Sequence, residues 1–177
     1  FIRADELLKM RKDVLRLTTG SQALDKIVDG GLETQTITEF YGEYGSGKSQ
    51  MFHQLCVNVQ LPPERGGLDG GALYVDTENT FRLERIVQMA KHAGIEPEEA
   101  VKNIIYAEAY TSDHQMFLLE NADEIIARRD GKNSSISTKT TTEDISRISE
   151  THSTGERSSS GLIITIPTAI PNNANAP

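Results

Sequence analysis

An eight-residue stretch constrains the fold of this chain more than any other feature: Gly42-Glu43-Tyr44-Gly45-Ser46-Gly47-Lys48-Ser49. It fits the phosphate-loop pattern, in which two glycines are separated by four residues and followed by Lys and Ser. Residues 36–41 upstream are β-branched and aromatic and predict a strand. Residues 50–60 downstream carry apolar side chains at helical spacing and predict a helix, which Pro62-Pro63 stops. A strand, a glycine-rich turn and a helix in this order form a cradle for phosphate.

The same pattern gives individual residues their expected roles. Lys48 is expected to reach the terminal phosphates of a bound nucleotide, and the Ser49 hydroxyl to hold Mg²⁺. All eight residues, 42–49, are therefore candidates for binding a nucleoside triphosphate together with Mg²⁺. Tyr44 is expected to pack rather than to take part in chemistry.

Composition limits the alternatives. With 177 residues, of which 37% are hydrophobic, the chain is long enough for about one globular domain. The formal charge of −8 argues against a broad basic surface, so contacts with nucleic acid need a local patch or other segments. The single cysteine, Cys56, predicts a buried reduced thiol. The chain shows no signal peptide and no apolar run of membrane-spanning length, which favours a cytoplasmic protein.

The chain divides at about Ile126. Residues 1–16 read as a charged linker, and residues 17–126 alternate predicted strands and helices, which is typical of an α/β fold with a mainly parallel sheet. Strands are expected at 72–76 and 104–107, and helices at 83–93, from Pro97 and at 113–126. Residues 127–177 form a Ser/Thr-rich tail that is expected to be mostly disordered; its apolar run Leu162–Ile166 could form an isolated strand, but Pro167 and Pro171 frame it, which favours disorder there too.

A second acidic site follows the predicted strand that ends at Asp76, in the stretch Asp76-Thr77-Glu78. Ligands of α/β sheets bind beyond the carboxyl ends of the strands, where a carboxylate can activate a water molecule. A solvated acidic turn explains the same residues equally well. The histidines His53, His92 and His114 show no metal-ligand spacing and are expected at the surface or half-buried.

Three blocks closely resemble the archaeal RadA recombinases of the RecA-like strand-exchange family: residues 40–63, 75–85 and 109–116. The resemblance runs almost continuously from Phe1 to Ile126 and implies the N-terminal half of a RecA-like ATPase core. In that family, ATP lies between protomers of a helical filament on single-stranded DNA, which is paired with a homologous duplex. The resemblance implies that Glu78 is the water-activating base and that Arg85 packs on the adenine, beside the roles of Lys48 and Ser49 given above.

The resemblance extends to the start of the chain and includes two departures. Phe1 and Ala4 match the polymerisation motif, in which a Phe and an Ala enter pockets on the next protomer. Asn79 stands where the family usually has Gly, and it is expected to keep the turn because Asn tolerates a left-handed backbone. Leu83 replaces a usual Pro at the start of a helix.

The family pattern is not recognisable after residue 126, where a strand ending in a second Mg²⁺-site Asp and two DNA-binding loops are expected. The parent is expected to be a DNA-dependent ATPase, and this chain to be inactive alone, with an open sheet edge. Residues 144–149 can be back-translated and reread one base out of frame to give Ile-Phe-Arg-Glu-Tyr-Pro, which resembles the family's Phe-Arg-x-Glu-Tyr stretch, so a reading-frame error is one hypothesis for the tail. Two alternatives stay open: a non-catalytic module that docks on a recombinase and caps or regulates its filament, and a recombinase paralogue.

Overall fold

The computed structural model describes residues 3, 5–6, 14–34, 36–122 and 124, together with the backbone of residues 162–166. Phe1 and Ala4, the expected interface residues, lie outside this part of the chain. The elements follow in this order: β1 (Arg16–Leu17), α2 (Gln22–Ile27), β2 (Leu32–Glu33), α3 (Lys48–Asn58), the short 3-10 helix η2 (Pro63–Arg65), β3 (Gly71–Asp76), α4 (Leu83–Ala93), α5 (Pro97–Lys102), β4 (Ile104–Glu108), α6 (Ser112–Glu120) and β5 (Leu162–Ile166).

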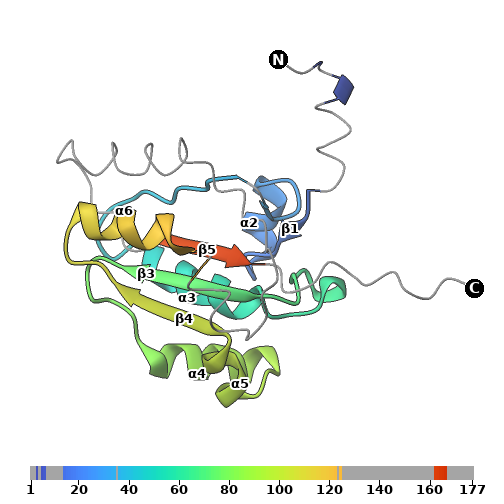
Figure 1. Ribbon diagram of the computed structural model, residues 1–177. Coiled ribbons are helices and arrows are strands. Elements are labelled where there is room, and N and C mark those ends of the chain that lie inside the picture. The colour runs from blue at the N-terminus through green and yellow to red at the C-terminus, as the bar shows by residue number, and fades with distance from the viewer. Residues whose placement is uncertain are drawn as a thin grey trace, which may run out of the picture.

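Strand β3 is the centre of a three-stranded sheet with the order β4-β3-β5 (Figure 1). It pairs in parallel with β4, in a register that sets Ala72 opposite Ile104 and Asp76 opposite Glu108. The chain between these two strands contains α4 and α5, as a parallel connection requires. The predicted α/β fold with a parallel pair of strands is confirmed. A separate two-stranded antiparallel sheet joins β1 to β2.

All six residues of β3 are buried because helices cover both faces of the sheet. Ala72 and Tyr74 belong to a core cluster formed mainly with α3 and α4, whereas Leu73 and Val75 pack in a second cluster with α6. This division follows from the alternation of side chains along a strand. Figure 1 shows α6 on one side of the sheet, with α4 and α5 on the other. Strands buried on both faces read as continuous apolar runs, as this one does.

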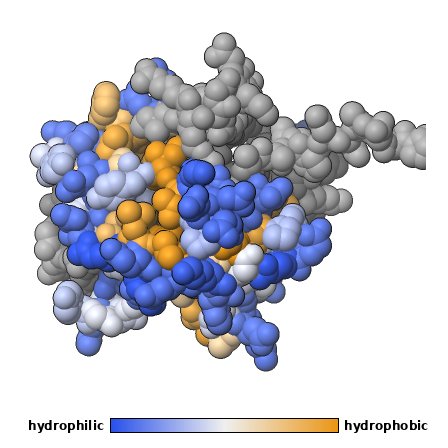
Figure 2. Space-filling view, turned by 90° about the horizontal axis from the view of Figure 1, so that it is seen from below, coloured by the Kyte–Doolittle hydropathy of each residue, from blue (hydrophilic) through white to orange (hydrophobic). Residues whose placement is uncertain are grey.

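Helix α4 has the bounds that its apolar spacing predicts, and Leu83 begins it despite replacing the usual proline. Ile86 and Ala90, one turn apart, are fully buried, whereas Glu84 and Lys91 are exposed. Figure 2 views the molecule from below in Figure 1 and shows mostly hydrophilic side chains on this side, with an apolar band between them. Helix α4 is therefore a surface helix whose inner stripe packs against α3.

The strand predicted at residues 36–41 is wrong, because the structure has no regular element there. Ile37 and Tyr41 are exposed, and Phe40 instead packs edge-on against Phe52 of α3, with ring centroids 5.8 Å apart. β-branched and aromatic residues favour a strand only where a neighbouring strand accepts their backbone hydrogen bonds. Both edges of β3 are already paired, with β4 and β5.

The expectation of disorder is wrong for residues 162–166, which form β5. This strand runs antiparallel to β3 and sets Leu162 opposite Val75 and Ile166 opposite Gly71. It occupies the edge of β3 opposite β4. The other residues of 127–177 lie outside the described part of the chain, as does the predicted end of α6 near Ile126. None of the helices described is long and apolar enough to cross a membrane.

Candidate nucleotide-binding site

The phosphate loop has the backbone geometry that its glycines predict. Gly45 and Gly47 have φ angles of 77° and 93°, in the left-handed region that other L-residues enter only at a cost. Gly47 is the N-cap of α3, so the helix begins at Lys48 and its first intrahelical bond runs from Met51 N to Gly47 O at 2.9 Å. The N–H groups of the first turn have no intrahelical acceptor, so they are available to an anion.

Lys48 lies at the loop itself. Its Nζ donates hydrogen bonds to the carbonyl oxygens of Gly42 and Glu43, at 2.9 and 3.0 Å. The ammonium group is thus held among backbone groups of the same loop that the pattern assigns to phosphate. Tyr44 is fully exposed, with a relative accessibility of 103%, so the expectation that it packs is wrong. It stands in the turn of residues 44–45, where its side chain projects into solvent.

The structure gives different surroundings to Asp76, the last residue of β3, and to Glu78 in the loop that follows. Asp76 is fully buried, and its carboxylate accepts hydrogen bonds from the backbone N–H groups of Glu78, Thr80 and Phe81 at 3.1, 3.2 and 2.9 Å. Glu78 is exposed, and no hydrogen bond or ion pair within the described residues holds its carboxylate. Asp76 therefore shapes the loop, whereas Glu78 remains available for chemistry. Asn79 has a φ of 53°, which confirms the expected left-handed turn.

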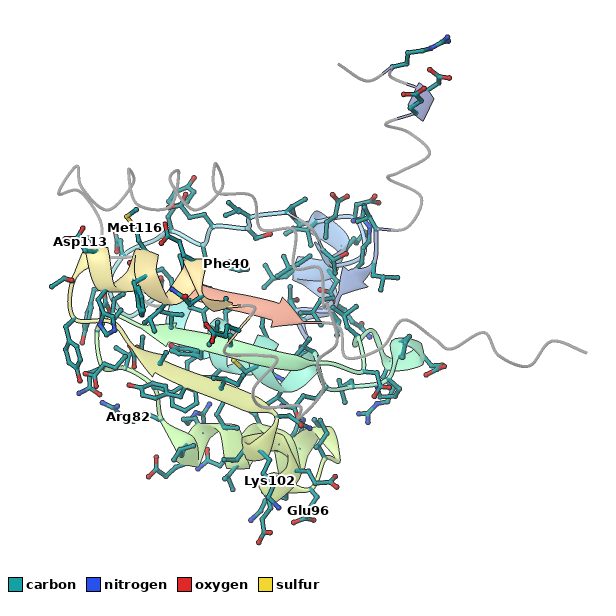
Figure 3. All side chains as sticks on the ribbon, viewed as in Figure 1. Phe40, Arg82, Glu96, Lys102, Asp113 and Met116 are labelled. Atoms are coloured by element: carbon teal, nitrogen blue, oxygen red, sulfur yellow. The ribbon has the colours of Figure 1, made fainter. Side chains whose placement is uncertain are left out.

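Arg85, the candidate for adenine packing, lies beside the helix that follows the phosphate loop. Its Nε donates to Gln50 Oε1 at 2.9 Å, and its Nη1 donates to Gln88 Oε1 at 2.6 Å. Gln50 directly follows Ser49, so α4 brings the guanidinium group to the start of α3. Figure 3 shows Arg82, which precedes α4, near the end of the sheet where β3 and β4 finish, with Lys102 and Glu96 far from it.

His53 of α3 contradicts the sequence expectation, because it is only 1% exposed. Its Nε2 accepts the backbone N–H of Arg82 at 3.3 Å. One signal could have predicted this burial. Most of the second half of α3 is buried on all sides, including Phe52, Val57 and Asn58. A short helix with apolar residues around most of its circumference is a core helix, so its polar residues are inside too.

Cys56, in the same helix, is a free and fully buried thiol, as predicted, and burial raises the pKa of that thiol. Its place in the core excludes it from the site.

The side chains that could serve as ligands indicate how Mg²⁺ would be bound. Among the described residues, no group of three His, Cys, Asp or Glu side chains could hold a metal ion by itself. Mg²⁺ usually takes one or two protein ligands and completes its shell with water and substrate phosphates. Ser49, in the first turn of α3 beside Lys48, fits that mode of binding.

Comparison with known proteins gives the family. The profile of the Rad51 family matches residues 10–134, a range that includes the phosphate loop, the Asp76–Glu78 stretch and Arg85. The chain belongs to the Rad51 family. The DNA repair and recombination protein RadA of Metallosphaera sedula is 55% identical over 128 residues. This confirms the predicted resemblance to archaeal RadA recombinases.

The extent of the Rad51-family match is informative too. The alignment with the RadA protein covers 72% of this chain but 40% of that protein. The chain therefore spans about two fifths of the length of the curated relative it matches. The family profile stops at residue 134, close to residue 126, where the composition changes.

Proposed function

We propose that this chain is the ATP-binding part of a Rad51-family recombinase that acts in DNA repair. The observation that carries the proposal is the geometry of the phosphate loop, in which Gly45 and Gly47 are left-handed and α3 starts at Lys48. A glycine-rich turn that leads into a helix N-terminus favours negative charge through its N–H groups and the helix dipole. The match to the Rad51 family supports ATP as the nucleotide.

Each site residue has a role in this proposal. Lys48 exchanges its two carbonyl partners for the β- and γ-phosphates, and the loop N–H groups bind the phosphate oxygens. Ser49 holds Mg²⁺, which, when bound, neutralises charge on the phosphates. Glu78 orients and deprotonates the attacking water, and its exposure leaves the carboxylate free for this. Arg85 packs its planar guanidinium group on the adenine.

The partners follow from the family. The parent protein assembles into a filament on single-stranded DNA and pairs that strand with a homologous duplex, with Phe1 and Ala4 as contacts to the next protomer. The net charge of −8 makes this chain a poor nonspecific binder of DNA by itself. Its DNA contacts therefore come from other parts of the recombinase.

Binding of a fluorescent ATP analogue with Mg²⁺ tests the nucleotide site directly. Lys48→Ala should weaken binding by about tenfold to a hundredfold, because a hydrogen bond to a charged group contributes about 1.5–3 kcal/mol. Lys102→Ala is the matched control, because it removes an exposed ammonium group at the end of α5 and should leave the affinity unchanged. Equal affinity of the Lys48→Ala variant and the unmodified chain would refute the phosphate-loop assignment. In the whole recombinase, Lys48→Ala should abolish ATP-dependent strand exchange.

A further inference from the structure

His53 connects two parts of the site that are far apart in the sequence. It lies on α3, the helix that starts in the phosphate loop at Lys48, and its ring nitrogen accepts the backbone N–H of Arg82 at 3.3 Å. Only a neutral imidazole has a nitrogen that can accept a hydrogen bond. Burial lowers the pKa of His53; the Asp76 carboxylate opposes this shift and the Arg85 and Arg82 guanidinium groups add to it. The ring is therefore neutral near pH 7.

Aromatic neighbours fix the orientation of this ring. His53 stacks on Tyr74 of β3 with ring centroids 5.6 Å apart and an interplanar angle of 8°. Phe81 lies against both rings, with its centroid 5.4 Å from His53 and 4.7 Å from Tyr74. Such contacts leave an imidazole little freedom to rotate. The direction of the Nε2 lone pair toward Arg82 is thus a property of the core packing.

The loop of residues 77–82 is consequently held from two sides. Asp76, at the end of β3, accepts the N–H groups of Glu78, Thr80 and Phe81. His53, on α3, accepts the N–H of the next residue, Arg82. Asp76 therefore ties the loop to the sheet, and His53 ties it to the phosphate-loop helix.

We propose that His53 is a positioning residue, which couples the loop of residues 77–82 to the phosphate-loop helix and so sets where Glu78 stands relative to Lys48 and Ser49. The consequence of this coupling for catalysis rests on the proposed function, in which Glu78 is the base. The coupling itself is independent of the proposed function, because it rests on the hydrogen bond between His53 and Arg82. When the phosphate loop binds phosphate and α3 moves, His53 transmits that movement to residues 77–82, the segment that carries Glu78.

Amide hydrogen exchange of the chain tests the link. His53→Phe keeps the aromatic packing but removes the acceptor, and it should speed exchange of the Arg82 amide about two- to tenfold, in line with the loss of one hydrogen bond. His53→Gln places an acceptor near the position of Nε2 and should restore most of the protection. His92→Gln, at an exposed position of α4, is the matched control and should change nothing. Should His53→Phe fail to fold in thermal unfolding, His53→Met provides a similar volume without an acceptor nitrogen.

A second arm adds a fluorescent ATP analogue with Mg²⁺. In the unmodified chain, binding should slow exchange in residues 77–82. The folded His53→Phe variant should bind the analogue with an affinity within about threefold of the unmodified chain, yet its loop should no longer respond. Two results for a folded His53→Phe variant would overturn the inference. One is an unchanged exchange rate of the Arg82 amide. The other is exchange in residues 77–82 that still slows when the nucleotide binds. Failure of the unmodified chain to bind nucleotide overturns the proposed function instead, and the first arm then still decides the link.

Discussion

Asp76 shows how a buried carboxylate can hold the backbone of a neighbouring loop. The carboxylate is fully buried, and among the described residues it accepts hydrogen bonds from three backbone N–H groups and, at 3.5 Å, from the Tyr106 hydroxyl. A hydrogen-bonded carboxylate of this kind orders the segment that donates to it, here the loop that carries Glu78. The residues alone left the two carboxylates equivalent, and only the resemblance to the recombinase family singled out Glu78; the burial of Asp76 could not be predicted from the sequence.

The first prediction concerns Asp76. Asp76→Ala should lower the free energy of unfolding by about 3–5 kcal/mol, because three part-buried N–H groups lose their acceptor at about 1–3 kcal/mol each and the loop relaxes in part. Asp76→Asn keeps one acceptor oxygen and should cost less than the alanine variant. Urea unfolding measures both. Asp113→Ala, an exposed carboxylate in the first turn of α6, is the control and should cost less than about 0.5 kcal/mol. A loss below about 1 kcal/mol for Asp76→Ala would contradict the role given to this carboxylate.

A second residue-scale prediction concerns pH and Asp25 of α2. Burial raises the pKa of Asp25, but hydrogen bonds from the Thr18 and Thr19 hydroxyls and the Thr19 N–H outweigh it and lower the pKa below 3.8. A lowered carboxyl pKa stabilises the fold above the unfolded value of about 3.8, and this stability is lost as the pH falls through the folded pKa. The free energy of unfolding, measured from pH 6 to pH 2, should therefore change less with pH in the Asp25→Asn variant than in the unmodified chain. Asp113→Asn is the comparison, and equal slopes for Asp25→Asn and the unmodified chain would contradict the assignment.

At the scale of elements, prediction succeeded where the signal is local. Helix α4 has the bounds that its apolar spacing indicated, and β3 and β4 stand where short apolar runs were found. The strand predicted at residues 36–41 does not form, and β5 was not predicted; both errors have the same cause. Both depend on which segment pairs with the edge of β3, and a pairing between distant segments leaves no periodicity in either.

The candidate site shows the same division. The left-handed turns of the phosphate loop and the start of α3 could be predicted, because they are encoded within eight residues, whereas the exposure of Tyr44 could not. The link from His53 to Arg82 could not, because it joins residues 29 positions apart through the interior. The only hint in the sequence was that apolar residues lie around most of the circumference of this helix, among them Phe52, Leu55 and Val57.

The prediction at this scale concerns the packing of α4. Ile86→Ala should cost about 2–5 kcal/mol of unfolding free energy, because Ile86 is fully buried in the cluster with α3 and β3 and its loss leaves a cavity. Leu83→Ala removes a side chain of similar volume from the same helix, but one that is 51% exposed, and should cost less than about 1 kcal/mol. Chemical denaturation compares the two variants. Similar costs would mean that α4 does not pack as described.

At the scale of the whole molecule, the candidate site is built from one continuous stretch. The phosphate loop, α3, the loop after β3 and the start of α4 all lie between residues 42 and 85. This stretch falls inside the Rad51-family match and depends on β3 as its common support. The pairing partners of β3 therefore determine how firmly the site is held.

Strand β5 supplies the last prediction, because it covers one edge of β3 with a segment that lies outside the family match. A chain that ends at residue 161 lacks β5, whereas one that ends at residue 166 keeps it. We expect the shorter chain to lose more than about 2 kcal/mol of unfolding free energy, because backbone groups of a buried strand lose their partners at about 1–3 kcal/mol each. An open strand edge also promotes aggregation, so light scattering should rise only for the shorter chain. If the two chains unfold and scatter alike, β5 does not stabilise β3.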